Sequence, residues 1–382
     1  MSDLRYSLLR GGLVYRVSRL SGLTRVQHRL APLVAIVLVL FIVVPMVMAT
    51  ARDGTLVGGV TVPLLHDYSI WARFVVAVPL LVLAAPMADE RLWRAIKHLQ
   101  GLVDATDRDR FEGVLAQMRR WRDAWLPELL LFAASVLASY VIPVLGLLDN
   151  VSDWRGNAGA VSFATVWLQW VAMPVIRFLT LLWFWRLALW IVLLFRFSRF
   201  NLDLHAAHPD GRGGLAFLGY AQTAFVVLPL VGGITLAGTL AMDVQYFGAE
   251  LKSLRFIMGG YVVLGVVLMV APLLLLVPRL AALKRNSLLA YGALGTDCSE
   301  GFELKWLGRA RGGASPILEA GDSSALCDLI GVYATVSQMS TIPLQRFLLV
   351  QFAIASALPL VPVVLMRMPI KELLGKILSA LA

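Results

Sequence analysis

The chain has 382 residues, of which 59% are hydrophobic and 15% charged, and its mean hydropathy is +0.77. Soluble globular proteins have about 25% charged residues. This composition therefore excludes an ordinary soluble protein, and it also excludes a disordered chain, a coiled coil and a disulfide-rich scaffold. It predicts an all-α, polytopic membrane protein.

The formal net charge is +10, with 34 Lys and Arg residues against 24 Asp and Glu. In a soluble protein this excess would favour nucleic acid as a partner. In a membrane protein, basic residues instead collect in cytoplasmic loops. Because topology explains the excess, we predict the lipid bilayer, and no nucleic acid, as the partner.

A helix needs about 20 mostly apolar residues to cross the hydrocarbon. Seven stretches qualify, at about 32–50, 68–87, 125–148, 161–195, 215–242, 256–277 and 347–366. The first could instead be a cleaved signal peptide, but its basic arm and its apolar run are both too long. The fourth could be two half-spans broken at Pro174; since no turn signal interrupts it, we predict one long helix.

Six arginines lie in the first 29 residues. If this arm is cytoplasmic, 24 Lys and Arg residues lie inside and 7 outside, and Arg73, Arg177 and Arg186 lie within spans. The predicted organisation is a cytoplasmic arm (1–29), spans one and two (30–87), a cytoplasmic amphipathic hairpin (88–124), spans three to six (125–278), a cytoplasmic helical segment (279–346), and span seven with an external C-terminal tail (347–382).

The two cytoplasmic segments are expected to be helical. Apolar residues of the first segment recur at helical spacing, at Leu92, Ile96, Leu99 and Val103 and again at Phe111, Leu115 and Met118. Thr106 and Asp109 resemble a capping box between its two helices. The hairpin could pack on the rest of the protein, lie on anionic lipid or bind a partner. The second segment is expected to extend the sixth span to about Trp306 and then form another helix.

A polar string from Asn201 to Gly214 could bind a divalent metal ion. On a helix, His205 and His208 would share a face, and Asp210 or Asp203 would add an oxygen ligand. The alternatives are a structural junction, because Pro209-Asp210-Gly211 is typical of a turn, and a ligand or proton-linked site. No other cofactor is predicted.

Arg177 lies inside the fourth span, where a charge is expensive. It could line a pore or bind an anion. It could also form a structural ion pair, for which Glu128 is the nearest acid in the sequence, or extend towards the interface. Arg186 and the tryptophans around it, Trp183, Trp185 and Trp190, are typical of interfacial anchors.

Gly233, Ala237 and Ala241 form a small-residue stripe in the fifth span. Such a stripe permits close helix packing, either within the chain or in a homo-oligomer.

Three stretches together resemble a group of bacterial polytopic inner-membrane proteins without an assigned activity. They are 62–80, 185–218 with His208-Pro209-Asp210-Gly211, and 293–306. The resemblance implies a bacterial inner membrane and no mechanism. The residues favour passage of a small solute or ion; the alternatives are a scaffold or sensor that presents cytoplasmic helices to a partner, and a membrane enzyme with a metal site at His205 and His208.

Overall fold

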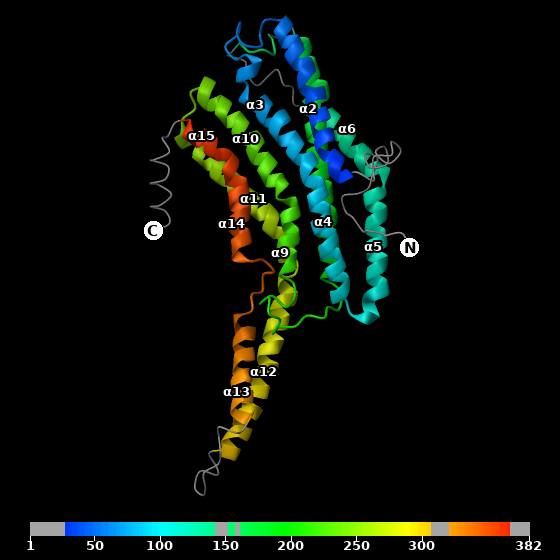
Figure 1. Cartoon of the computed structure of the whole chain (residues 1–382), viewed down its shortest axis with the longest axis vertical. Helices are drawn as coiled ribbons and strands as arrows, with labels where there is room; N and C mark the ends of the chain where they lie inside the picture. Colours follow the sequence, from blue (N-terminus) through cyan, green and yellow to red (C-terminus); the bar gives the residue numbers. More distant parts are fainter. Residues whose placement is uncertain (1–26, 142–151, 157–160, 307–320, 367–382) are drawn as a thin grey trace.

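The chain folds as a bundle of long helices (Figure 1). The computed structural model describes residues 27–141, 152–156, 161–306 and 321–366. Within these ranges, extended pairing is limited to two isolated bridges, Val62 with Asp153 and Val103 with Leu202. The predicted all-α bundle is confirmed. Most of the basic arm, the end of the third predicted span and the C-terminal tail lie outside the described residues.

The first half of the chain contributes α2 (Gln27–Arg52), α3 (Tyr68–Trp71), α4 (Val78–Leu102), α5 (Arg108–Asp123), α6 (Trp125–Val141), α7 (Phe163–Trp167) and α8 (Met173–Phe197). The second half contributes α9 (Phe217–Gln222), α10 (Val227–Tyr246), α11 (Leu251–Leu274), α12 (Val277–Trp306), α13 (Gly321–Gln338), α14 (Arg346–Ala357) and α15 (Val361–Leu365).

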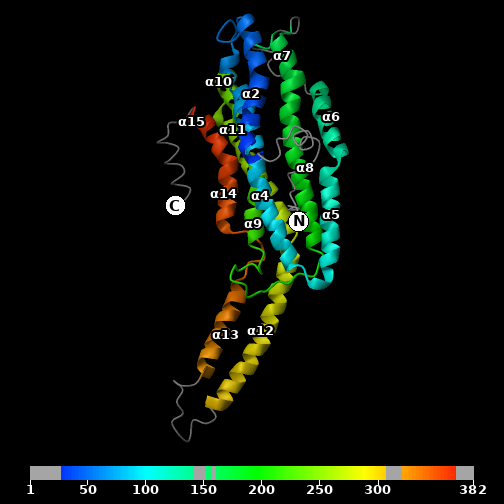
Figure 2. The same cartoon turned by 45° about the vertical axis from the view of Figure 1, so that its right-hand side comes forward.

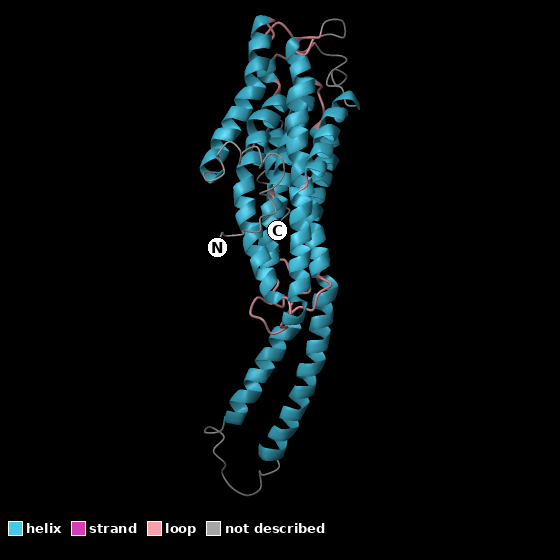
Figure 3. Ribbon diagram, turned by 90° about the vertical axis from the view of Figure 1, so that its right-hand side faces the viewer, coloured by secondary structure: helices cyan, strands magenta, loops and turns pink. Residues whose placement is uncertain are grey.

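Helices α12 and α13 leave the bundle together as a projecting hairpin, which is seen along its length in Figure 3. We call the end of the bundle from which they project the hairpin end. The opposite end carries the loops 53–67 and 152–156, and Figure 2 shows α2 and α7 reaching it.

Six helical segments are long and apolar enough to cross a membrane. They are Ala31–Arg52, Tyr68–Leu102, Phe163–Phe197, Phe217–Tyr246, Lys252–Leu274 and Arg346–Leu365; α5 and α6, bent by 42°, can act as a seventh, broken span. Their outer surfaces are apolar, as on α11, where Phe256, Val263 and Leu264 are exposed. Such surfaces are stable against lipid rather than water. The protein is an integral, multi-pass membrane protein.

Two prolines are accommodated by wide π-helical turns. The turn η3 (Ala72–Ala77) precedes Pro79, and η6 (Leu168–Ala172) precedes Pro174. A proline lacks the N–H and clashes with the carbonyl four residues earlier; that carbonyl lies inside the wide turn in both cases. The helix therefore continues past each proline, and the prediction of one long helix for the fourth span is confirmed.

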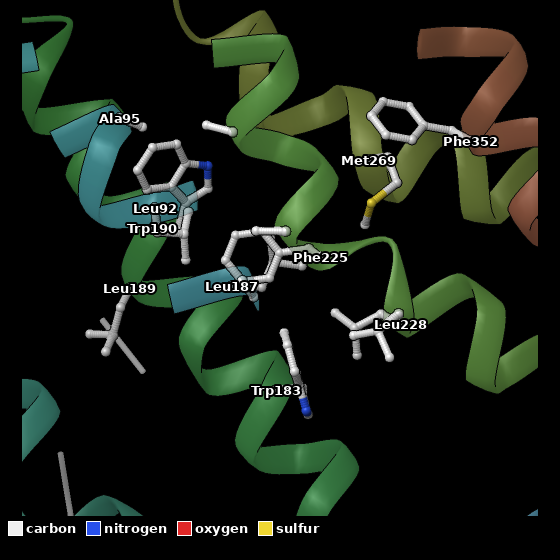
Figure 4. Close-up of a cluster of buried hydrophobic side chains, with 14 of the residues drawn as sticks. Leu92, Ala95, Trp183, Leu187, Leu189, Trp190, Phe225, Leu228, Met269 and Phe352 are labelled. Carbon is white, nitrogen blue, oxygen red and sulfur yellow. The ribbon is translucent and has the colours of Figure 1, made fainter. Parts of the chain in front are cut away.

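Two of the three tryptophans predicted as interfacial anchors on α8, Trp183 and Trp190, are core residues instead, whereas Trp185 is only partly buried. Trp183 and Trp190 are buried and lie beside Phe225 (Figure 4). Trp183 donates its Nε1–H to the Leu81 carbonyl at 3.1 Å, and Trp190 donates to Gln222 Oε1 at 3.0 Å. These bonds satisfy the indole N–H groups within the bundle, which is why these rings do not need the interface.

The second half of α4 and the whole of α5 form the hairpin predicted at residues 88–124. This α4–α5 hairpin packs on the rest of the protein. Phe111 is buried and contacts Phe197 and Phe200 edge to face. The expected capping box at Thr106 is not formed; the Asp104 carboxylate instead accepts the Thr106 N–H and hydroxyl, each at 2.9 Å. These hydrogen bonds lower the pKa of Asp104.

Glycines permit the closest helix approaches around α10. A Cβ at Gly233 would lie 3.1 Å from the Ser356 carbonyl oxygen and from Pro359, so this part of the small-residue stripe packs within the chain. A Cβ at Gly238 would lie 2.7 Å from the Ala72 Cβ and 3.0 Å from the Tyr68 carbonyl oxygen. Helix α10 can lie this close to α3 only without a side chain there.

Replacing Gly238 by Ala should therefore destabilise the protein by about 1–3 kcal/mol, because backbone must move to admit the methyl group. The matched control is Gly259→Ala on α11, where a Cβ would meet nothing within 4 Å. Thermal denaturation in detergent measures both. Equal Tm values for the two variants would contradict the close α3–α10 packing.

Candidate functional site

Arg177 is held by α6 within the membrane-spanning region. Its Nη1 donates to Ser139 Oγ at 3.0 Å, and Ser139 is buried. Gln169, from the π-helical turn of the same span, donates to the Ser139 carbonyl. These contacts give the guanidinium a polar environment in place of water, as expected for an intramembrane charge.

Glu128 interacts with Arg186 instead of Arg177, which corrects the expected pairing. Glu128 is buried in the first turn of α6. Arg186 interacts electrostatically with Glu128 and with buried Asp89 of α4, and Arg122 repels it. The register explains the exchange. α6 and α8 are antiparallel, and Arg177 lies opposite Ser139. Glu128, 11 residues before Ser139, is therefore displaced by roughly 16 Å along the bundle from Arg177 and lies near the level of Arg186.

A buried polar network at the opposite end of the bundle centres on Asp67. This carboxylate is 0% exposed. Its Oδ1 caps α3 by accepting the N–H groups of Ser69 and Ile70 and the Ser69 hydroxyl, at 3.1, 3.3 and 2.6 Å. Its Oδ2 accepts from Trp154 Nε1 at 3.0 Å and from Arg155 Nη2 at 2.8 Å.

The Asp67 network joins two loops that are far apart in the chain. Val62 accepts the Trp154 N–H at 3.1 Å and donates its own N–H to the Ser152 carbonyl at 3.2 Å. Arg155 also lies 3.6 Å from the Asp153 carboxylate. Burial raises the pKa of Asp153, and the positive charge of Arg155 only partly opposes this effect.

All acceptor positions of Asp67 are occupied by these donors, so the carboxylate has no free lone pair for a ligand or a travelling proton. Its chemistry is that of a structural lock between the loops. The sequence does not reveal this network, because Asp67 and Arg155 lie 88 positions apart. The local signal, Asp directly before a span with Ser two residues later, predicts only the helix cap.

The candidate metal ligands lie in a loop at the hairpin end, not on a helix, so they do not share a helical face. His205 pairs with Asp203 at 3.2 Å, and both side chains are 70% exposed. His208 Nδ1 lies 2.9 Å from Asp210 Oδ1. No group of three or more His, Cys, Asp or Glu with metal-binding geometry occurs within the described part of the chain.

Asp210 holds its own loop together. Its carboxylate accepts backbone N–H groups from Arg212, Gly214 and Ala216 at 2.7, 3.1 and 3.0 Å. Burial opposes its ionisation, but these bonds and His208 outweigh it and lower the pKa of Asp210. A carboxylate that already accepts three backbone N–H groups is a weaker metal ligand, so this geometry favours the structural-junction interpretation. Metal binding by His205, His208 and Asp210 stays a prediction.

The same loop docks on the base of the α12–α13 hairpin. Ser340 donates its N–H to the Gly211 carbonyl at 2.9 Å, and Lys284 Nζ donates to the Met339 carbonyl at 2.9 Å. Gly213 has a φ of +65°, and a Cβ there would lie 3.0–3.2 Å from Leu280, Leu283 and Met339. Only glycine satisfies both the conformation and the contact.

No family profile, curated protein or solved structure matches this chain, so its functional interpretation rests on its own residues.

Replacing Asp67 by Asn should cost about 3–5 kcal/mol of stability, because it leaves the buried Arg155 charge with only the longer, 3.6 Å contact to Asp153. The control, Arg94→Gln, removes an exposed pair with Glu90 and should cost under about 0.5 kcal/mol. Thermal denaturation in detergent separates the two effects. A D67N protein as stable as R94Q would show that the network does not lock the two loops.

Proposed function

We propose that this protein is a membrane-anchored scaffold whose α12–α13 hairpin pairs with the hairpin of a second copy. The observation that carries the proposal is the apolar surface of a hairpin that stands outside the bundle (Figure 3). Leu289 of α12 is 71% exposed and Ile330 of α13 is 59% exposed, although neither helix lies within the apolar spans.

Charge is scarce in the middle of this hairpin, although α12 carries Arg279, Lys284 and Arg285 near its base and Asp297, Glu300, Glu303 and Lys305 near its tip. Residues 286–296 contain no charged side chain, and α13 contains only Asp322 and Asp328. Water-exposed surfaces typically have about 25–35% charged residues. This composition is typical of a surface that another protein surface covers.

The hairpin also buries little within one copy. Leu280 of α12 and Val336 of α13 are its buried side chains among the described residues. Two helices with so small a shared core are marginal, whereas four helices enclose a continuous core. A two-fold pairing brings identical uncharged faces together without like-charge repulsion. A charged partner would find few counter-charges on the uncharged stretch 286–296 and the facing part of α13, so a second copy fits best.

The hairpin is joined to the membrane region almost without interruption. α11 ends at Leu274 and α12 begins at Val277. A change in the position of α11 would therefore reach the hairpin directly, which supports a sensor as well as a static scaffold.

For the location we propose a bacterial inner membrane, with the hairpin end and N-terminal arm in the cytoplasm and the C-terminus outside. The asymmetry of Lys and Arg supports this orientation. The resemblance of 62–80, 185–218 and 293–306 to bacterial inner-membrane proteins supports the choice of membrane.

Pairing of the hairpins can be measured with the two native cysteines, Cys298 on α12 and Cys327 on α13, which are both exposed. In a Cys327→Ser protein reconstituted in nanodiscs, a nitroxide on Cys298 has no partner label within its own chain. We therefore expect a dipolar signal in pulsed electron paramagnetic resonance only if two copies pair.

Adding Leu289→Glu or Ile330→Glu to that background should abolish the signal, because each places a charge in the apolar contact. Ser299→Glu is the control, since it adds the same charge beside Glu300 in the charged tip of α12. The proposal fails if the unsubstituted hairpin gives no dipolar signal, or if L289E and I330E leave it intact.

Transport of a small solute or ion is a second candidate, which the intramembrane contacts of Arg177 with Ser139 favour. If this guanidinium serves transport, Arg177→Gln should reduce flux of small anions into proteoliposomes at least about tenfold, the effect of removing one charge-assisted contact. The control is Arg285→Gln on exposed α12. Unchanged flux, or no flux in the native protein, would remove the basis for transport.

A further inference from the structure

A cleft of about 430 Å³ opens where the hairpin meets the bundle. It lies between α11, the end of α13, the start of α14 and the loop at Gly211. Its walls combine apolar side chains, Val270, Ile342 and Leu349, with Ser340 and two arginines, Arg212 and Arg346. Ligand pockets of about 300–1,000 Å³ commonly have this mixture of apolar walls and a few polar groups.

Arg212 is fixed at the cleft by two backbone carbonyls. Its Nε donates to Leu344 at 3.2 Å, and its Nη1 donates to Asp210 at 3.2 Å. The Asp210 carboxylate accepts three backbone N–H groups and so is already occupied on the loop side. The guanidinium is therefore positioned before any ligand arrives.

Among the described residues, the side chain of Arg346 has no comparable hydrogen-bond partners. It is exposed at the first position of α14, and no acidic residue lies in that first turn. Across the described ranges, no carboxylate lies within ion-pair distance of Arg346. A cation at a helix N-terminus opposes the helix dipole. An anion in the cleft would relieve this opposition and pair with Arg212 as well.

The cleft lies at the edge of the lipid-facing surface. On α14, the exposed apolar side chains begin directly after Arg346, at Phe347 and Val350; on α11, they end at Leu274. Arginines at this edge lie at the level of lipid headgroups. The apolar walls, Val270 and Leu349, continue from the arginines into the apolar belt.

We infer that this cleft binds an anionic glycerophospholipid, with Arg212 and Arg346 on the headgroup phosphate and an acyl chain along Val270 and Leu349. The guanidinium fork suits phosphate oxygens, and the apolar walls suit the chain. Zwitterionic lipids offer a phosphate whose charge their own amine offsets, so they bind more weakly. The site does not depend on pairing of the hairpins.

The test uses the full-length protein, delipidated and reconstituted in phosphatidylcholine nanodiscs with spin-labelled phosphatidylglycerol. Electron paramagnetic resonance then measures the immobilised fraction of the labelled lipid. The variant is Arg346→Gln, which removes no described contact and should keep the native Tm. The control is Arg285→Gln, on α12 and outside the cleft.

We expect R346Q to weaken phosphatidylglycerol binding roughly tenfold, the loss of one charge-assisted hydrogen-bonded contact, and R285Q to leave it unchanged. Spin-labelled phosphatidylcholine should show no difference between the proteins. Equal binding of phosphatidylglycerol by R346Q and native protein would overturn the inference. Saturable binding of inorganic phosphate without phosphatidylglycerol binding would also overturn it, because the ligand would then be a free anion and not a lipid.

Discussion

The bundle depends on one constraint: in hydrocarbon, every backbone N–H and C=O must find a partner within the protein. This constraint explains why the spans are helical. It also explains the local structure at the prolines, where a regular helix would be interrupted. Pro79 and Pro174 each follow a π-helical turn, which moves the clashing carbonyl aside while the helix continues. Where the chain leaves the helices, at loops 53–67 and 152–156, it has already reached the end of the bundle, and polar groups of the two loops pair with each other.

Three arginines at different levels of the bundle each have polar partners within the protein. At the opposite end, Arg155 is paired with Asp67. Further towards the hairpin end, Arg177 donates to the Ser139 hydroxyl, and Arg186 interacts with the carboxylates of Glu128 and Asp89. Isolated charges would be prohibitive in lipid. With these polar partners, the arginines tie together neighbouring helices and the two loops at the opposite end, and they make the packing of the bundle specific.

Much of the fold could be predicted from hydrophobicity because lipid exposure acts on each span independently. The apolar spans, the single long fourth helix and the inward face of α5 all follow from local patterns. The Arg186–Glu128 interaction and the Asp67 network did not, because they depend on the relative register of helices far apart in the chain. The buried tryptophans were also missed; a Trp suits a membrane interface and a core equally well, and only the acceptors at Leu81 and Gln222 decide between them.

The near-continuity of α11 and α12 has a mechanical consequence. With 30 residues, α12 is about 45 Å long at 1.5 Å per residue, and it is rooted in a membrane-spanning helix. If α11 and α12 tilt as one rod, rotation by about 5° would carry the distal end of α12 sideways by about 4 Å. The hairpin would then work as a lever, which converts small adjustments among packed membrane helices into displacements as large as a side chain.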